Sequence, residues 1–242
     1  MKTVLITGSS RGIGAAIARR LNKDYKIVIN YKSSKDQALK LMDELRETNP
    51  YVIAAPADMT KEDDVDKIFS LAEKNFGSVD ILINNAGISS FSLIQDMEFA
   101  SWKNVLATNL DSVFLASKRA IPNMLKNGGG VIVNMSSIWG ELGASMETAY
   151  SASKGAINSF TKALSKELAP SKIRVNAIAP GIVDTDMMRN DFSKEELDLL
   201  KNEVGLNRFA DANEIAGLVA YLISDEASYI TGEIININGS FY

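Results

Sequence analysis

The stretch Thr3-Val-Leu-Ile-Thr-Gly-Ser-Ser-Arg-Gly-Ile-Gly14 decides the fold. Its first four residues are β-branched or apolar and lack polar alternation, which is typical of a strand buried on both faces. A glycine-rich turn follows at once, and Ile13, Ile17 and Leu21 then recur at helical spacing. The segment therefore predicts a strand, a tight turn and a helix in direct succession.

The glycines of this turn suit a dinucleotide. Gly8 allows the tight turn, Gly12 lets a pyrophosphate approach the backbone, and Gly14 lets the helix pack on the strand. The helix N-terminus carries partial positive charge and faces the anion. The chain has no Gly-x-x-x-x-Gly-Lys-Ser/Thr motif, so a dinucleotide site is favoured over a nucleoside triphosphate site. A glycine-rich turn that binds nothing is the alternative interpretation.

Further apolar runs alternate with helical segments along the rest of the chain. This alternation predicts a doubly wound α/β fold, one Rossmann-like domain over residues 1–242, with a parallel sheet of about seven strands and helices on both faces. The predicted strands are Thr3–Ile6, Lys26–Ile29, Tyr51–Ala55, Val79–Ile83, Val131–Val133, Ile173–Ile178 and Ile234–Ile237.

Composition excludes several kinds of chemistry. The 242 residues include no Cys and no His, which rules out disulfides, Cys/His zinc sites, Ser-His-Asp triads and any histidine base. The net charge of -4 is a poor match to nucleic acid or an anionic membrane. The longest apolar stretch, Leu218–Ile223, is far too short to span a bilayer. We expect a soluble cytoplasmic protein that binds no metal.

The end of the second strand indicates which dinucleotide is bound. NAD sites usually carry an acidic residue there, whereas this chain has Asn30, Tyr31 and Lys32. Lys32 and Arg11 would attract a 2'-phosphate, and Ser10 or Asn30 could hydrogen-bond to it. The pattern favours NADP(H), although Lys32 could also be an ordinary solvated charge.

Without His or Cys, the best catalytic candidates are Ser137, Tyr150 and Lys154. Tyr150 and Lys154 stand four residues apart, so on a helix they share one face. A neighbouring ammonium is expected to lower the tyrosine pKa from its usual value of about 10. Ser137 ends the fifth strand and could hydrogen-bond to an oxygen on which negative charge develops.

These motifs together resemble a classical short-chain dehydrogenase/reductase over essentially the whole chain. The matching elements are Thr7-Gly8-x-x-x-Gly12-x-Gly14, Asn84-Asn85-Ala86-Gly87, Asn109, Tyr150-x-x-x-Lys154 and Pro180-Gly181-Ile182-x-x-Thr185. The resemblance implies hydride transfer between a nicotinamide cofactor and a carbonyl or secondary alcohol, with Tyr150 as the proton donor and Ser137 steadying the oxygen.

The resemblance also implies the remaining site residues. Asn109, in a long helix from Trp102 to Lys126, would hold a water that connects Lys154 to solvent. Lys154 would also bind the nicotinamide ribose, and Asp58 beside Met59 would bind the adenine. The cofactor-binding residues expected in all are Gly8, Ser10, Arg11, Gly12, Ile13, Gly14, Asn30, Tyr31, Lys32, Asp58, Met59, Asn85, Ala86, Gly87, Tyr150, Lys154, Pro180, Gly181, Ile182 and Thr185.

Within the family, the chain looks most like a 3-oxoacyl-acyl-carrier-protein reductase of fatty acid biosynthesis. The arginines with which that subfamily grips its carrier do not align cleanly with Lys126–Gly130 and Ser171–Arg174. The alternatives are an NADP-dependent reductase of a free ketone, sugar or secondary alcohol, and a regulatory protein that binds NADP without turnover. Apolar residues on two helices, namely Val113, Phe114, Phe160 and Leu164, fit a homo-oligomer, either a tetramer or a dimer.

Three insertions after strand ends are expected to form the substrate mouth: Ile88–Ser101, Ile138–Thr148 and Ile182–Asn213. The last carries too many apolar residues for a solvated loop. We expect it to be a partly helical substrate lid over residues 182–213, with Ser193 as the N-cap and Glu195-Glu196 in the first turn. A fixed helix that completes the core is the alternative. The apolar positions are Met187, Met188, Phe192, Leu197, Leu199 and Leu200.

Overall fold

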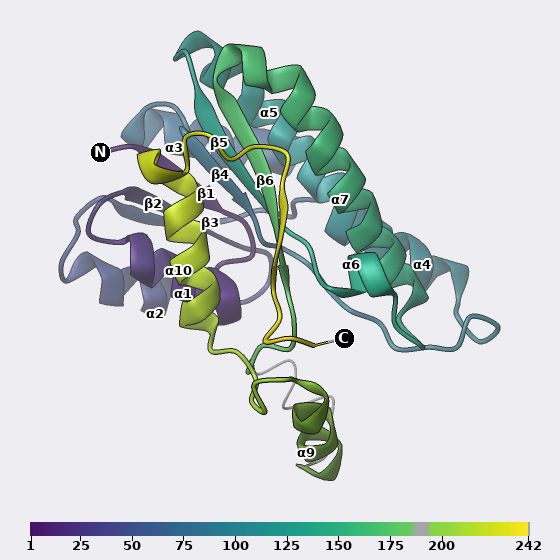
Figure 1. The fold of residues 1–242 in the computed structure, drawn as a ribbon. Helices are drawn as coiled ribbons and strands as arrows, with labels where there is room; N and C mark the ends of the chain where they lie inside the picture. Colours follow the sequence, from purple (N-terminus) through teal and green to yellow (C-terminus); the bar gives the residue numbers. More distant parts are fainter. Residues whose placement is uncertain (186–193, 242) are drawn as a thin grey trace.

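A computed structural model describes residues 1–185 and 194–241 of the chain, which form one α/β domain around a parallel sheet (Figure 1). The seven strands lie in the order β3-β2-β1-β4-β5-β6-β7. They are β1 (Thr3–Ile6), β2 (Lys26–Tyr31), β3 (Val52–Pro56), β4 (Ile81–Asn84), β5 (Gly130–Met135), β6 (Ile173–Pro180) and β7 (Ile234–Ile237). All seven predicted strands are confirmed, with ends that shift by a few residues.

Helices cover both faces of this sheet. In chain order they are α1 (Gly12–Leu21), α2 (Lys35–Arg46), α3 (Glu62–Phe76), α4 (Phe99–Leu106), α5 (Ser112–Lys126), α6 (Trp139–Leu142), α7 (Thr148–Leu168), α9 (Lys194–Glu203) and α10 (Ala212–Ile223). A π-helical turn, η1 (Ala107–Asp111), joins α4 to α5. The expected long helix from Trp102 to Lys126 is therefore interrupted, and it begins earlier than the sequence indicated.

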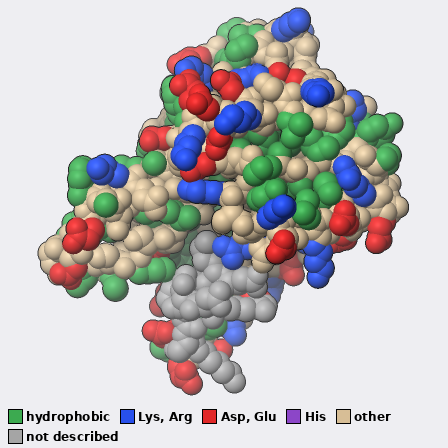
Figure 2. Space-filling model, turned by 180° about the vertical axis from the view of Figure 1, so that it is seen from behind, with side chains coloured by type: hydrophobic (Ala, Val, Ile, Leu, Met, Phe, Trp, Pro, Cys, Tyr) green, Lys and Arg blue, Asp and Glu red, His purple; other side chains and the backbone are tan. Residues whose placement is uncertain are grey.

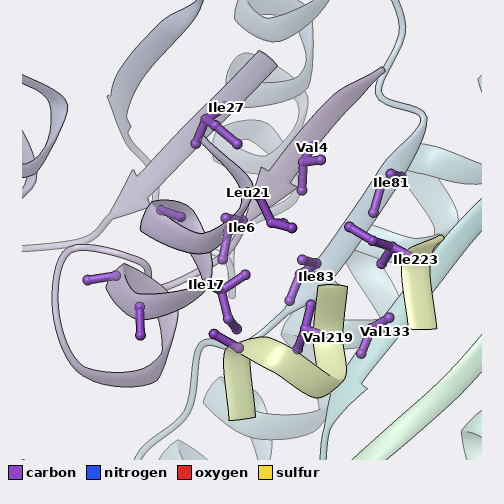
Figure 3. Close-up of a cluster of buried hydrophobic side chains, with 14 of the residues drawn as sticks. Val4, Ile6, Ile17, Leu21, Ile27, Ile81, Ile83, Val133, Val219 and Ile223 are labelled. Carbon is purple, nitrogen blue, oxygen red and sulfur yellow. The ribbon is translucent and has the colours of Figure 1, made fainter. Parts of the chain in front are cut away.

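Alternate residues of each strand enter two separate cores, because successive side chains in a strand point to opposite faces. On one face, Ile6 and Ile83 pack with Ile17 of α1 and Val219 of α10 (Figure 3). On the other, Leu5 and Leu82 pack with side chains of α3, α5 and α7 such as Phe69, Ala116 and Leu164. This burial on both faces explains why the strands read as uninterrupted apolar runs.

The strand order places a ligand crevice between β1 and β4. β1 pairs with β2 on one side and with β4 on the other, all parallel. The connections from these strands run in opposite directions across the sheet, so the loops at their carboxyl ends separate and leave a crevice. The glycine turn after β1 and the Asn84–Gly87 segment that ends β4 lie at this edge.

None of the helices within the described ranges is long and apolar enough to cross a membrane. Of the apolar residues expected at an interface, Val113 and Leu164 are buried within the chain itself, whereas the Phe114 side chain is 49% exposed. In the view from behind, apolar side chains gather in a patch that is bordered by Lys, Arg, Asp and Glu (Figure 2).

Candidate active site

A cavity of about 500 Å³ opens at the carboxyl edge of the sheet. It runs from the glycine turn and the end of β2 to Tyr150 and Lys154, and each of the three insertions contributes to its wall. All the site residues expected from the sequence line it except Gly14 and Asn109. Segment 186–193 and the side chain of Lys194 lie outside the described residues, and with them Met187, Met188, Phe192 and Ser193 of the expected lid.

The glycine turn is pressed against the end of β4. Gly8 has φ +60°, and a Cβ there would come within 2.9 Å of the Ala86 Cα atom. The Thr7 hydroxyl accepts hydrogen bonds from the amides of Asn85 at 2.9 Å and Ala86 at 3.0 Å. A Cβ at Gly14 would come within 2.7 Å of the Ser9 Cα atom, so Gly14 serves the close packing of α1 and does not face the cavity.

The start of α1 fits a negatively charged group. Arg11 is its N-cap and makes no side-chain capping hydrogen bond, so the amides of the first turn remain for a ligand. Gly12 has φ +56°, and the nearest atom to a Cβ built there is a Thr185 methyl carbon 3.9 Å away. This open backbone at a helix N-terminus is the geometry that a pyrophosphate needs.

Asn30 is buried and holds the glycine turn in place. Its Oδ1 accepts a hydrogen bond from the Gly8 amide at 3.0 Å, and its Nδ2 donates to the Ala57 carbonyl at 3.1 Å. Its backbone N–H donates to the Ser9 hydroxyl at 3.1 Å. Both ends of the amide are thus used within the protein, so Asn30 positions the turn and its side chain is not directed at a 2'-phosphate.

Lys32 and Asp58 meet at the adenosine end of the cavity. The Lys32 ammonium lies 2.9 Å from Asp58 Oδ2, and the Thr60 hydroxyl donates to Asp58 Oδ1 at 2.8 Å. Partial burial raises the pKa of Asp58, but the hydrogen bonds from Lys32 and Thr60 outweigh it and hold that pKa below its usual value. No motif in the sequence indicated that these two residues would pair.

Lys154 and Tyr150 project from one face of α7 toward the end of β5. The Lys154 ammonium is buried, donates to the Met135 carbonyl at 2.7 Å, and lies 5.4 Å from the centre of the Tyr150 ring. Ser137 is the second residue after β5, and its hydroxyl accepts a hydrogen bond from the Trp139 amide at 3.2 Å. The Lys154–Met135 hydrogen bond joins α7 to the end of β5, so the serine, tyrosine and lysine lie at one end of the cavity.

Burial, and not the ammonium, dominates the titration of this pair. Burial raises the pKa of Tyr150 to about 12, a hydrogen bond with Ser137 opposes the shift, and the charge of Glu147 adds to it. Burial also lowers the pKa of Lys154 to about 8. The expected lowering of the tyrosine pKa is not found in this structure, because burial of the phenol sets the direction of the shift.

Asn109 lies on η1 and is fully buried behind the cavity wall. Its Oδ1 accepts from the Ile88 amide at 2.8 Å, and its Nδ2 donates to the Ile88 carbonyl at 2.9 Å and to the Ser153 hydroxyl at 3.0 Å. A Cβ built on Gly87 would lie 3.3 Å from Asn109 Oδ1 and 3.5 Å from Lys154 Nζ. Asn109 thus fixes the backbone that borders Lys154.

Two polar residues beside the candidate catalytic residues were not predicted from the sequence. Glu147 is buried, lines the cavity and accepts a hydrogen bond from the Ser89 hydroxyl. Asn158 accepts a hydrogen bond from the Ser136 hydroxyl at 2.6 Å, which fixes the residue before Ser137. Their spacing from Tyr150 and Lys154, three and four residues, could have indicated that they share a helix face.

Comparison with known proteins agrees with this geometry. Residues 2–196 match the short chain dehydrogenase family. The chain is 40% identical to the uncharacterized oxidoreductase YmfI of Bacillus subtilis, over 100% of this chain and 99% of that protein. It is 39% identical to the 3-oxoacyl-acyl-carrier-protein reductase FabG of Staphylococcus epidermidis (100% and 99%) and 38% identical to that of Staphylococcus aureus (100% and 98%). A glycine turn over a helix N-terminus, a Tyr150-x-x-x-Lys154 pair and full-length similarity lead to one conclusion: the chain belongs to the short-chain dehydrogenase family of oxidoreductases, which use a nicotinamide cofactor.

Proposed function

We propose that the protein reduces the 3-oxo group of an acyl thioester with NADPH. The observation that carries this proposal is the convergence of Ser137, Tyr150 and Lys154 at one end of a cavity whose other end holds Arg11 and Lys32. Full-length similarity to two proteins named 3-oxoacyl-acyl-carrier-protein reductases supports the thioester. Apolar residues at the catalytic end, such as Ile88, Phe91 and Leu200, support an acyl chain.

The chemistry would proceed as follows at the catalytic end. The cofactor, when bound, supplies the hydride for the carbonyl carbon. Ser137 would donate a hydrogen bond to the carbonyl oxygen, and Tyr150 would give that oxygen its proton. A protonated Tyr150 is the form that burial favours, which suits a proton donor at neutral pH. Lys154 would hydrogen-bond to the cofactor ribose. Its ammonium would also place a positive charge near Tyr150.

The preference for NADP(H) rests on charge at the end of β2. Lys32 is an exposed cation, and the next residues, Ser33 and Ser34, are neutral. A 2'-phosphate could displace the Asp58 carboxylate from Lys32 and form a charge-assisted contact in its place.

One observation favours a substrate that is not bound to a carrier. The stretches Lys126–Gly130 and Ser171–Arg174 lie together at the amino edge of the sheet, around a hollow of about 310 Å³. The charges around this hollow are mixed, because Asp80 and Asp225 stand with Lys2, Lys172 and Arg174. The Arg174 guanidinium donates to the carbonyls of Ser224 and Ile230 at 3.1 and 3.4 Å. A free ketone, sugar or secondary alcohol is therefore the second candidate substrate.

We further propose that the protein forms a homo-oligomer. The exposed Phe114 and the apolar patch seen in Figure 2 support this proposal. The lid over residues 182–213 also stays a proposal. Its described part includes α9, where Leu200 lines the cavity and Leu199 is 66% exposed.

The test is a spectrophotometric assay of the purified protein. We expect oxidation of NADPH with acetoacetyl thioesters of N-acetylcysteamine and of acyl carrier protein, and much slower oxidation with simple ketones and sugars. Tyr150→Phe serves as the inactive control for contaminating reductases. Turnover of ketones or sugars in preference to both thioesters would replace this proposal with the second candidate. Cofactor binding without turnover of any carbonyl compound would indicate a regulatory protein.

A further inference from the structure

Glu147 places a carboxylate in the wall of the substrate cavity. It is 7% exposed, and it stands three residues before Tyr150, at the start of α7. Among the described residues that line the catalytic end of the cavity, Glu147 and Lys154 are the charged ones, and the others are apolar or neutral. The Lys154 ammonium is directed at the Met135 carbonyl on the floor of the site.

The carboxylate is turned toward the cavity wall by the fold around it. Glu147 is the N-cap residue of α7, yet its side chain makes no capping hydrogen bond with that helix. It accepts instead from the Ser89 hydroxyl, which is 58 residues away in sequence and also lines the cavity. A helix N-terminus carries partial positive charge, which favours an anionic side chain at this position.

A strained residue fixes this arrangement. Met146 has φ +65°, a left-handed conformation that is unfavourable for a side chain of this kind. Its carbonyl accepts a hydrogen bond from the Ser92 amide at 2.8 Å. Two contacts, Ser92 to Met146 and Ser89 to Glu147, therefore tie the segment after β4 to the start of α7. Backbone strain that is retained beside a catalytic tyrosine points to a functional constraint on Glu147.

We propose that Glu147 is a specificity-determining residue that rejects substrates with a negative charge next to the reacting carbonyl. The acyl group must then arrive as a neutral ester, thioester or amide, and the free 3-oxo acid is excluded. This inference rests on the proposed function and names the form of the substrate. The same charge that adds to the rise in the pKa of Tyr150 would repel a carboxylate bound beside that tyrosine.

The size of the effect follows from Coulomb's law. A substrate that places its carbonyl at Tyr150 brings a carboxylate two bonds away into the same partly buried cavity as Glu147. For two unit charges about 8 Å apart, an effective dielectric constant of about 20 gives a repulsion of about 2 kcal/mol. Repulsion at that separation exceeds the roughly 1.4 kcal/mol that corresponds to a tenfold change in rate. We therefore expect discrimination of at least about tenfold.

The experiment compares acetoacetamide with acetoacetate, which have nearly the same shape and differ in charge at pH 7. The quantity measured is the ratio of kcat/KM for the amide to kcat/KM for the acid, with NADPH in excess. The wild-type protein should favour the amide by at least tenfold, and Glu147→Gln should lower that ratio by at least tenfold. Glutamine keeps the shape and an oxygen that can accept from Ser89.

The matched control is Glu141→Gln, which removes an exposed carboxylate on α6 that accepts from Asn236 outside the cavity. Its ratio should equal that of the wild type. Equal turnover of amide and acid by the wild type would overturn the inference even if Glu147→Gln does not fold. A ratio that is unchanged in a folded Glu147→Gln variant would also overturn it. Failure to reduce either compound, or methyl acetoacetate, would instead overturn the proposed reduction of 3-oxoacyl groups.

Discussion

The Lys32 ammonium lies 2.9 Å from the Asp58 carboxylate, so two residues expected to bind different parts of the cofactor's adenosine neutralise each other. Lys32 is exposed and Asp58 is mostly buried, with side-chain exposures of 64% and 14%. The buried partner is fixed by Thr60, whereas the lysine can swing toward solvent. Binding of a 2'-phosphate would then exchange one anionic partner of Lys32 for another.

This pairing leads to a prediction about cofactor choice. Lys32→Ala should raise the Kd for NADPH by about tenfold, because a charge-assisted contact worth about 1.4 kcal/mol is lost. The Kd for NADH should change less than threefold. Fluorescence titration of both cofactors would measure this. Lys35→Ala, on the exposed start of α2 and outside the cavity, is the control and should alter neither value. Equal losses for both cofactors in Lys32→Ala would contradict the assignment.

A second prediction separates proton transfer from cofactor binding. Tyr150→Phe should reduce kcat at least a thousandfold and leave the Kd for the cofactor within about threefold, because only the hydroxyl is lost. Lys154→Ala should damage both, since its ammonium is given two roles. Stopped-flow turnover and equilibrium binding would be measured on the same preparations. Substantial activity in the phenylalanine variant would end this mechanism.

A third prediction concerns the pH dependence of stability. The pKa of Lys154 is lowered to about 8 by burial, whereas an unfolded lysine keeps its ordinary value near 10.5. Between these values the unfolded state binds more protons, so the free energy of unfolding should rise with pH from 8 toward 10. The full effect corresponds to about 3 kcal/mol. Lys154→Met should lack this rise.

Tyr150 should act in the opposite direction at higher pH. Its pKa is raised to about 12, so the folded state holds the proton longer, and stability should fall as pH rises from about 10 to 12. Urea unfolding of the wild type, Lys154→Met and Tyr150→Phe between pH 7 and 11 would test both directions. Parallel pH profiles for all three proteins would show that neither group contributes.

A fourth prediction tests the lid. Backbone amides at Leu197–Leu200 of α9 should exchange at least tenfold more slowly when NADPH and a substrate analogue are bound, because Leu200 lines the cavity. Amides of α10 at Val219, Leu222 and Ile223, whose side chains are buried in the core, serve as the internal reference. If α9 is as well protected alone as with ligands, it is a fixed part of the domain.

The sheet could be predicted because its strands are buried on both faces, whereas the exact ends of the strands could not. β5 was expected to end at Val133 but continues to Met135, since Asn134 is a polar residue inside a strand. Its amide donates to Thr161 at 2.9 Å and accepts from Asn84 at 2.8 Å. Burial of a polar side chain with its partners supplied from other elements leaves no apolar pattern in the sequence.

Site residues that belong to motifs could be predicted, whereas those defined by contacts between elements could not. Glu147 and Ser89 are 58 positions apart, and Lys32 and Asp58 lie on different connections. Asn30 was expected to face the ligand, but its hydrogen bonds to Gly8 and Ala57 follow from how β2 pairs with its neighbours. Such contacts depend on strand order, which local periodicity does not specify.

The π-helical turn at Ala107–Asp111 has an evolutionary consequence. It accommodates one residue more than an α-helix would, and each residue in a helix rotates the chain by about 100°. Deleting one residue there would either turn Asn109 away from the Ile88 backbone or rotate Ala116 out of the core. A single substitution in this stretch leaves its length unchanged, whereas an insertion or deletion would disturb either the Asn109 contact or the burial of Ala116. We therefore expect insertions and deletions to be rarer at η1 than at the surface turns.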